Sequence, residues 1–146
     1  MNDLLLKQYI GLIECNNEEI SILANTSAFI MQNFQDISWA GFYLFKNNEL
    51  ILGPFQGKIA CTNIPLDKGV CGKAASTQKT VIVEDVHQFA GHIACDSESN
   101  SEIVIPLIKG NQLYGVLDLV STSFSRFSKE DQIIFEEISK ILVQHL

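Results

Sequence analysis

The feature that most constrains the fold is a pair of apolar segments joined by a short turn. Residues 102–108 and 113–121 are both rich in β-branched and aliphatic side chains, which favours strands. The turn between them, Lys109-Gly-Asn-Gln112, has residues that favour tight chain reversal. The two segments therefore predict a β-hairpin, and hairpin connections produce antiparallel sheets.

Other short segments predict further strands and flanking helices. Residues 37–45, 49–53, 59–64 and 81–83 are strand-like; we expect Pro54 to end the second of these. Residues 4–34 predict helix, and a short helix should follow the glycine turn at 69–72. Residues 128–131 resemble a capping box with Asp131 in place of Glu, and they should begin the last helix. The expected apolar stripe of the first helix is Ile20, Leu23, Ala24, Ser27, Ile30, Met31 and Phe34.

This order of elements predicts an α+β fold. We expect an antiparallel β-sheet with N- and C-terminal helices packed on one face. With 146 residues, 47% of them apolar, residues 1–146 should form a single domain around one sizeable core.

Charge and composition exclude several classes of function. The formal net charge is −7 and there is no polybasic patch, so nucleic acid and anionic membrane surfaces are poor partners. The N-terminus has no basic region or small-residue cleavage site, and no apolar run is long enough to span a bilayer. We therefore expect a cytoplasmic protein. Its four cysteines then favour catalytic, redox or metal-binding roles over structural disulfides.

A long polar stretch between the predicted strands at 81–83 and 102–108 is the strongest candidate for a functional loop. It contains Cys95, flanked by acids, hydroxyls and His92. Long loops inside compact domains are usually functional or disordered, and loops on a rigid scaffold commonly carry reactive groups. An inert cysteine in a solvated connector is the alternative.

The spacing of Cys61, Cys71 and Cys95 argues against a zinc site, because no two are in a Cys-x-x-Cys pair. His92-x-x-Cys95 alone is a weak metal signal, so we expect no metal. A redox relay fits better: one thiolate attacks an electrophilic sulfur, and a second thiol closes a disulfide. Glu102 and Asp118, in or near strands, are candidate proton donors because burial raises carboxyl pKa values. Cys15 is expected to be a small packing residue.

At these residues the chain resembles the free methionine-(R)-sulfoxide reductases, which are GAF-domain enzymes. The similarity runs from about residue 20 to the last helix and is carried by residues 39–43, 52–61, 69–72, 91–96 and 99–104. Its most distinctive segments are Gly-Pro-Phe-Gln-Gly at 53–57 and Gly-His-Ile-Ala-Cys at 91–95. The resemblance implies a GAF fold, free methionine (R)-sulfoxide as substrate, thioredoxin as reductant, no cofactor and, since relatives are often dimeric, a homodimer.

The same resemblance implies roles for individual residues. Cys95 matches the catalytic cysteine, Cys61 a resolving cysteine and Cys71 the third thiol, although which of the latter two resolves stays open. Glu102 and Asp118 match acids around the sulfoxide. Trp39 matches an aromatic wall for the substrate methyl group, and Tyr43 lies beside it. The further expected substrate-binding residues are Ile93, Ala94 and Val120.

One position departs from the family pattern. The family usually has Asp-x-Asp in the last strand, whereas this chain has Asp118-Leu-Val120. The missing acid would lower or abolish the activity. The alternatives are therefore a GAF module that binds a small molecule without turnover, or a thiol redox sensor.

Overall fold

The predicted hairpin forms part of a single sheet in a computed structural model that describes residues 2–91 and 97–146. Six antiparallel strands lie in the order β3-β2-β1-β6-β5-β4. Strands β5 and β6 pair from Ser101–Ser121 to Lys109–Gln112, as the hairpin requires. The strands are β1 (Trp39–Lys46), β2 (Glu49–Gln56), β3 (Asn63–Pro65), β4 (Val81–Val83), β5 (Ser101–Lys109) and β6 (Gln112–Ser121).

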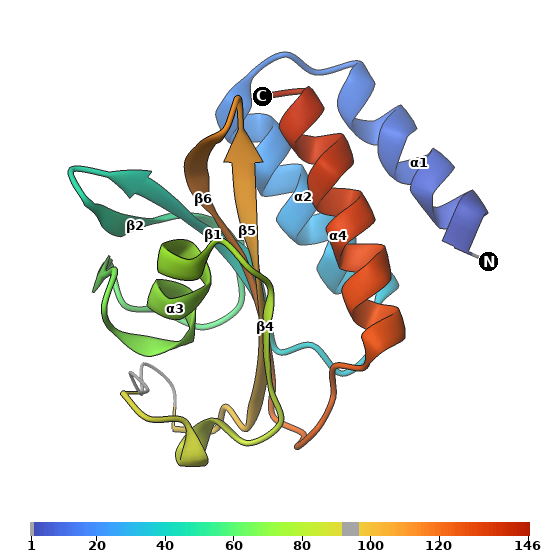
Figure 1. Cartoon of the computed structure of the whole chain (residues 1–146). Helices are drawn as coiled ribbons and strands as arrows, with labels where there is room; N and C mark the ends of the chain where they lie inside the picture. The colour runs from blue at the N-terminus through green and yellow to red at the C-terminus, as the bar shows by residue number, and fades with distance from the viewer. Residues whose placement is uncertain (1, 92–96) are drawn as a thin grey trace.

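The helices are distributed unequally over the two faces of the sheet. Three of them, α1 (Asn2–Glu14), α2 (Glu19–Asn33) and α4 (Lys129–Gln144), lie on one side, and α3 (Gly69–Thr77) lies on the other (Figure 1). A short 3-10 turn, Val86–Gln88, follows β4. The predicted α+β arrangement, an antiparallel sheet with the terminal helices on one face, is confirmed.

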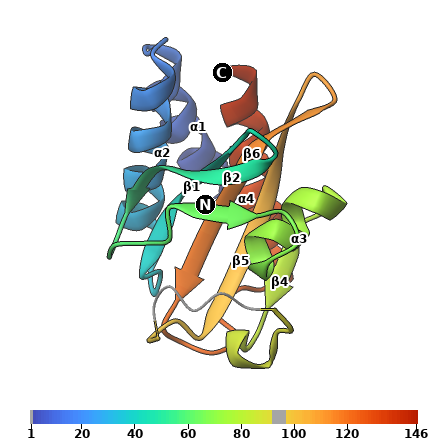
Figure 2. The ribbon, with the colours of Figure 1, turned by 90° about the vertical axis from the view of Figure 1, so that its left-hand side faces the viewer.

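Strand alternation gives each face its own core. Phe42, Ile103 and Leu117 point toward the terminal helices and are fully buried. Their sequence neighbours Tyr43 and Val116 point to the opposite face, where α3 packs. Figure 2 looks onto this second face, with α3 in front of the sheet. The alternation therefore places Glu102 and Asp118 on the α3 side.

The predicted N-terminal helical region consists of two helices. The chain leaves α1 and restarts as α2, and the amide of Glu18 donates to the Asn16 side chain in the connection. The buried face of α2 is also rotated: Ile20 is 70% exposed and Ala24 is exposed, whereas Thr26 is buried. Thr26 is tolerated inside because its hydroxyl pairs with the Ile22 carbonyl and with Tyr9, which hydropathy alone did not reveal.

Two predicted strand boundaries were wrong. Strand β2 continues past Pro54 to Gln56, because the pairing with β1 shifts between Gly41 and Tyr43 and proline is tolerated at such a bulge. Strand β3 covers only Asn63–Pro65, so residues 57–62 are not strand. The capping box is confirmed: Ser128 and Asp131 exchange hydrogen bonds at the start of α4. In the ranges 2–91 and 97–146, every helix is too short or too polar to cross a bilayer.

Candidate functional site

A small cavity of about 70 Å³ lies between the sheet and α3. The residues around it come from strands β1, β3, β5 and β6, from α3 and from the connections 57–62 and 97–100. They are Trp39, Tyr43, Lys58, Ile59, Ala60, Ile64, Gly69, Val70, Cys71, Ser99, Glu102, Asp118 and Val120. The cavity thus gathers predicted site residues that are far apart in the sequence.

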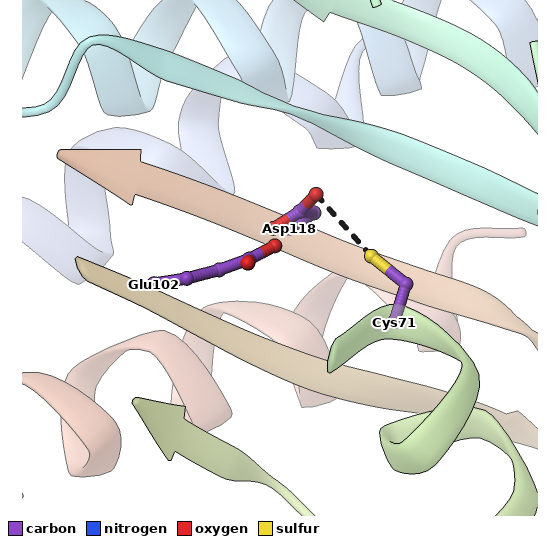
Figure 3. Close-up of side chains that lie close together, drawn as sticks. All are labelled: Cys71, Glu102 and Asp118. Atoms are coloured by element: carbon purple, nitrogen blue, oxygen red, sulfur yellow. Dashed lines mark hydrogen bonds between the residues drawn. The ribbon is translucent and has the colours of Figure 1, made fainter. Parts of the chain in front are cut away.

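Two acids and a thiol form the polar centre of this cavity. Glu102 on β5 and Asp118 on β6 are 7% and 6% exposed, and Cys71 in the first turn of α3 is 4% exposed. Val120 pairs with Glu102 across the two strands, so Asp118, two residues earlier, lies diagonally opposite Glu102 on the same face. The Cys71 Sγ donates to Asp118 Oδ2 at 3.2 Å (Figure 3). Figure 3 also shows the Glu102 carboxyl extending toward Asp118.

Burial controls the protonation of this cluster. The pKa of Glu102 is raised well above its ordinary value, first by desolvation and then by the charge of Asp118 and a hydrogen bond with it. Burial, and next the charges of Asp118 and Glu102, likewise raise the pKa of the Cys71 thiol. Glu102 is therefore suited to donate a proton, whereas Cys71 remains a thiol and is a poor nucleophile.

An aromatic wall forms one side of the cavity. The Trp39 ring stacks between Tyr43 and Phe55, with centroid separations of 6.0 and 5.2 Å. Gly41 makes this stacking possible, because a Cβ there would lie 2.3 Å from the Phe55 Cβ and 2.7 Å from the indole. Gly57 has φ +132°, and a Cβ there would also collide with the indole.

The polar atoms of the same wall hold the segment 57–62. Trp39 Nε1 donates to the Lys58 carbonyl at 3.0 Å, and the Tyr43 hydroxyl donates to the Cys61 carbonyl at 2.9 Å. The Leu52 amide donates to the Thr62 carbonyl at 2.9 Å. Cys61 is disulfide-bonded, whereas Cys71 and the exposed Cys15 are free thiols.

The connection between β4 and β5 contacts residues that line the cavity at two points. The Gly69 amide, at the start of α3, donates to the Gly91 carbonyl at 3.0 Å. Beyond the gap, Glu98 forms a 2.8 Å ion pair with Lys58, and both side chains are 66% exposed. The predicted site residues His92, Ile93, Ala94 and Cys95 lie outside the described residues.

The thiol and two acids also have the donor types of a metal site. Ligand atoms of Cys71, Glu102 and Asp118 lie within 4.8 Å of one another. Zn²⁺ would accept sulfur and oxygen ligands, but it binds the ionised thiolate and carboxylate forms. Burial favours protonated Cys71 and Glu102, which opposes metal binding, and the absence of a metal stays a prediction.

Comparisons with known proteins agree with the site. The GAF domain family matches residues 18–146. Free methionine-R-sulfoxide reductase of Escherichia coli (strain K12) is 52% identical over 128 residues, which cover 88% of this chain and 78% of that protein. The chain belongs to this family of GAF-domain reductases.

Solved structures extend this similarity to three dimensions. The structure of the reduced form of fRMsr of Staphylococcus aureus has a TM-score of 0.96 at 50% identity and covers 99% of this chain and 94% of its own. The structure of free methionine-R-sulfoxide reductase from Neisseria meningitidis in complex with its substrate has a TM-score of 0.95 at 40% identity. The match covers 99% of this chain and 87% of that chain. Helix α1 precedes the matched GAF residues, yet its Tyr9 and Ile13 are buried in the helix-side core.

Within this reductase fold, the structure brings together most of the predicted site residues that it describes. The predicted residues that line the cavity are Trp39, Tyr43, Cys71, Glu102, Asp118 and Val120. Cys61 adjoins them through its bond with Tyr43. Cys15 lies between α1 and α2, which pack on the opposite side of the sheet, and it is exposed, so the predicted packing role was wrong. The lining residues that were not predicted from the sequence are Lys58, Ile59, Ala60, Ile64, Gly69, Val70 and Ser99. All of them except Ile64 lie inside the segments 52–61, 69–72 and 99–104 that carry the family resemblance, and this was the available signal.

Proposed function

We propose that this chain reduces free methionine (R)-sulfoxide to methionine. The observation that carries the proposal is a buried acid, Glu102, whose pKa is raised by burial and by Asp118, and which faces the same small cavity as the Trp39 ring. An aromatic face suits an S-methyl group, and a buried acid suits a sulfoxide oxygen that gains a proton during reduction. The cavity of about 70 Å³ favours a free amino acid over a polypeptide segment. The names of the relatives add independent support.

In the proposed reaction, the Cys95 thiolate attacks the sulfoxide sulfur. Glu102 protonates the oxygen while Asp118 holds Glu102 in position through their shared hydrogen bond. The oxygen passes to Cys95, so methionine leaves and Cys95 becomes a sulfenic acid. The substrate is thereby reduced by two electrons and the thiol is oxidised by two. Trp39, Tyr43, Ile93, Ala94 and Val120 surround the substrate in this proposal.

The structure favours Cys61 over Cys71 as the resolving thiol. Cys61 is disulfide-bonded, whereas Cys71 is free and buried, with a raised pKa. We propose that Cys61 attacks the Cys95 sulfenic acid, forming the S–S bond and releasing water. Thioredoxin then reduces the disulfide by thiol exchange.

The remaining parts of the proposal concern the setting of the reaction. Residues 1–146 act as a single GAF domain, in the cytoplasm, with no cofactor because the thiols supply both electrons. The chain forms a homodimer in this proposal, because the family resemblance implies one.

A second candidate function is a GAF module that binds its ligand or senses oxidation without turnover. Val120 favours it, because an apolar residue stands directly opposite Glu102 and beside Trp39 in the strand pairing. It leaves fewer polar groups to stabilise a sulfoxide oxygen.

An assay that couples thioredoxin, thioredoxin reductase and NADPH oxidation tests the proposal. Free methionine (R)-sulfoxide should sustain turnover, whereas the S epimer and a peptide-bound (R)-sulfoxide should not. Cys15→Ser is the matched control, because Cys15 is free and lies on the other side of the sheet. Saturable binding without turnover would support the binding module. Disulfide formation by peroxide alone, unaffected by the sulfoxide, would support the sensor.

A further inference from the structure

The hydroxyl group of Tyr43 is the feature that the proposed reaction does not use. The Tyr43 ring lines the cavity, but its hydroxyl donates to the Cys61 carbonyl at 2.9 Å. Tyr43 lies in the middle of β1, is 3% exposed and is paired with β2 and β6 on either side. It is therefore a rigid donor attached to the centre of the sheet.

The acceptor belongs to a segment without regular structure. Residues 57–62, all of them described, lie between β2 and β3 and form neither helix nor strand. Trp39 and Tyr43 donate to carbonyl groups near the two ends of this segment, at Lys58 and Cys61. The Tyr43 bond is made to the peptide group of the disulfide-bonded cysteine itself.

We propose that Tyr43 is a positioning residue that holds the Cys61 backbone so that its thiol can form and keep its disulfide. The hydrogen bond fixes the peptide plane between Cys61 and Thr62. A thiol that is already held in position loses less conformational entropy when the S–S bond closes. The effective concentration of the Cys61 thiol is therefore higher. This role differs from the substrate contact that the sequence predicted for Tyr43.

The surroundings keep the hydroxyl in its donating form. Burial, followed by the negative charges of Asp118, Cys71 and Glu102 in their ionised forms, raises the pKa of Tyr43 above its ordinary value. The phenol therefore stays protonated over the pH range in which thiols exchange. A phenylalanine would fill the same space but would leave the half-buried Cys61 carbonyl without this donor.

The inference rests on the proposed function only where it gives Cys61 the resolving role. In that step the Cys61 sulfur attacks the sulfenic sulfur, the S–S bond forms and the S–O bond breaks. The hydroxyl leaves as water with the Cys61 proton. Disulfide exchange with glutathione involves the same Cys61 sulfur without any sulfoxide, so the two proposals can be tested separately.

The test compares Tyr43→Phe with Tyr9→Phe. Tyr9 is an equally buried tyrosine whose hydroxyl pairs with Thr26 at 2.7 Å on the helix side of the sheet, so its variant loses a similar bond away from the cavity. Each purified variant is equilibrated with glutathione buffers, and the Cys61 disulfide is quantified by alkylation and mass spectrometry. Tyr43→Phe should shift the equilibrium toward the thiol by about threefold to tenfold, and tenfold corresponds to about 30 mV. Tyr9→Phe should match the wild type.

A kinetic measurement separates positioning from substrate binding. In a single turnover, the rate of Cys61 disulfide formation divided by the rate of methionine release should be about threefold to tenfold lower in Tyr43→Phe than in the wild type. Equal disulfide equilibria in Tyr43→Phe and wild type, or equal shifts in both variants, would overturn the inference. Failure of the wild type to release methionine would refute the proposed function and leave the glutathione result interpretable.

A third measurement needs no variant, which matters if Tyr43→Phe does not fold. The Thr62 amide shares its peptide group with the Cys61 carbonyl, so its NMR order parameter in the reduced wild type reports on the tether. A rigid value of about 0.85 is expected, and a value below about 0.6 would overturn the inference.

Discussion

Replacing Glu102 by glutamine should lower activity and raise stability. Glutamine has nearly the same shape but cannot transfer a proton to the sulfoxide oxygen. Loss of a general acid lowers rates by about a hundredfold to ten-thousandfold. At the same time, the variant removes a carboxyl group that burial and the neighbouring Asp118 keep from ionising. The two effects have opposite signs, which separates a functional acid from a structural one.

The stability effect has a defined pH dependence. Because the pKa of Glu102 is raised on folding, the folded chain keeps a proton that the unfolded chain releases above its ordinary value of 4.5. Stability should therefore fall as pH rises from about 4.5 toward the folded pKa, by about 1.4 kcal/mol per pH unit. In Glu102→Gln this pH dependence disappears, so the stability of the variant relative to the wild type increases as pH rises. Wild-type turnover should likewise fall at high pH, as Glu102 ionises.

Urea unfolding over a pH series and kcat from the coupled assay would measure both effects. Glu136→Gln is a suitable control, because Glu136 lies on α4, away from the cavity. Its side chain forms hydrogen bonds with Thr80 and with Gln132. A Glu102→Gln protein with unchanged kcat would refute the role of Glu102 as proton donor. Parallel stability curves for the variant and the wild type would refute its raised pKa.

Three further substitutions test other parts of the site. Trp39→Ala should raise KM by about twofold to tenfold, the equivalent of a lost contact between sulfur and an aromatic ring, and an unchanged KM in a folded variant would contradict the pocket role. Cys71→Ser should keep kcat within about tenfold, because a hydroxyl can replace the S–H donor to Asp118; complete loss would give Cys71 the attacking role. Val120→Asp should raise kcat/KM by about tenfold to a hundredfold while lowering Tm, because it adds a half-buried acid opposite Glu102. An unchanged or lower kcat/KM would show that this chain does not use two acids on β6.

The parts of the fold that the sequence predicted are those set by local patterns. The hairpin followed from two apolar runs and a turn, and β5 and β6 pair as expected. The capping box at Ser128 also follows from residues that are close in sequence. Alternation placed Asp118 and Val120 on one face, and the structure has both around the cavity.

The errors occurred where tertiary contacts override local preference. The polar Thr26 is buried because Tyr9, seventeen positions earlier, supplies a hydrogen-bond partner. Pro54 stays within β2 because the pairing with β1 is irregular there. Neither partner is visible in a window of neighbouring residues.

The site was predicted where its residues lie on strands or in distinctive motifs. Lys58 and Ser99 were missed because they come from irregular connections, whose paths depend on the whole fold. Lys58 contacts two residues that are distant in sequence: the Trp39 indole and Glu98, which lies in the connection between β4 and β5. The role of the Tyr43 hydroxyl could not be predicted either, since its acceptor is a backbone carbonyl of another segment.

The most direct test of the proposed chemistry is the amount of methionine released per chain in the absence of any reductant. Fully reduced wild type and Cys61→Ser should each release about one methionine from free methionine (R)-sulfoxide and then stop, because oxidised Cys95 is not regenerated. Cys95→Ser should release none. Release by Cys95→Ser, or no release by folded and fully reduced wild type, would contradict the account.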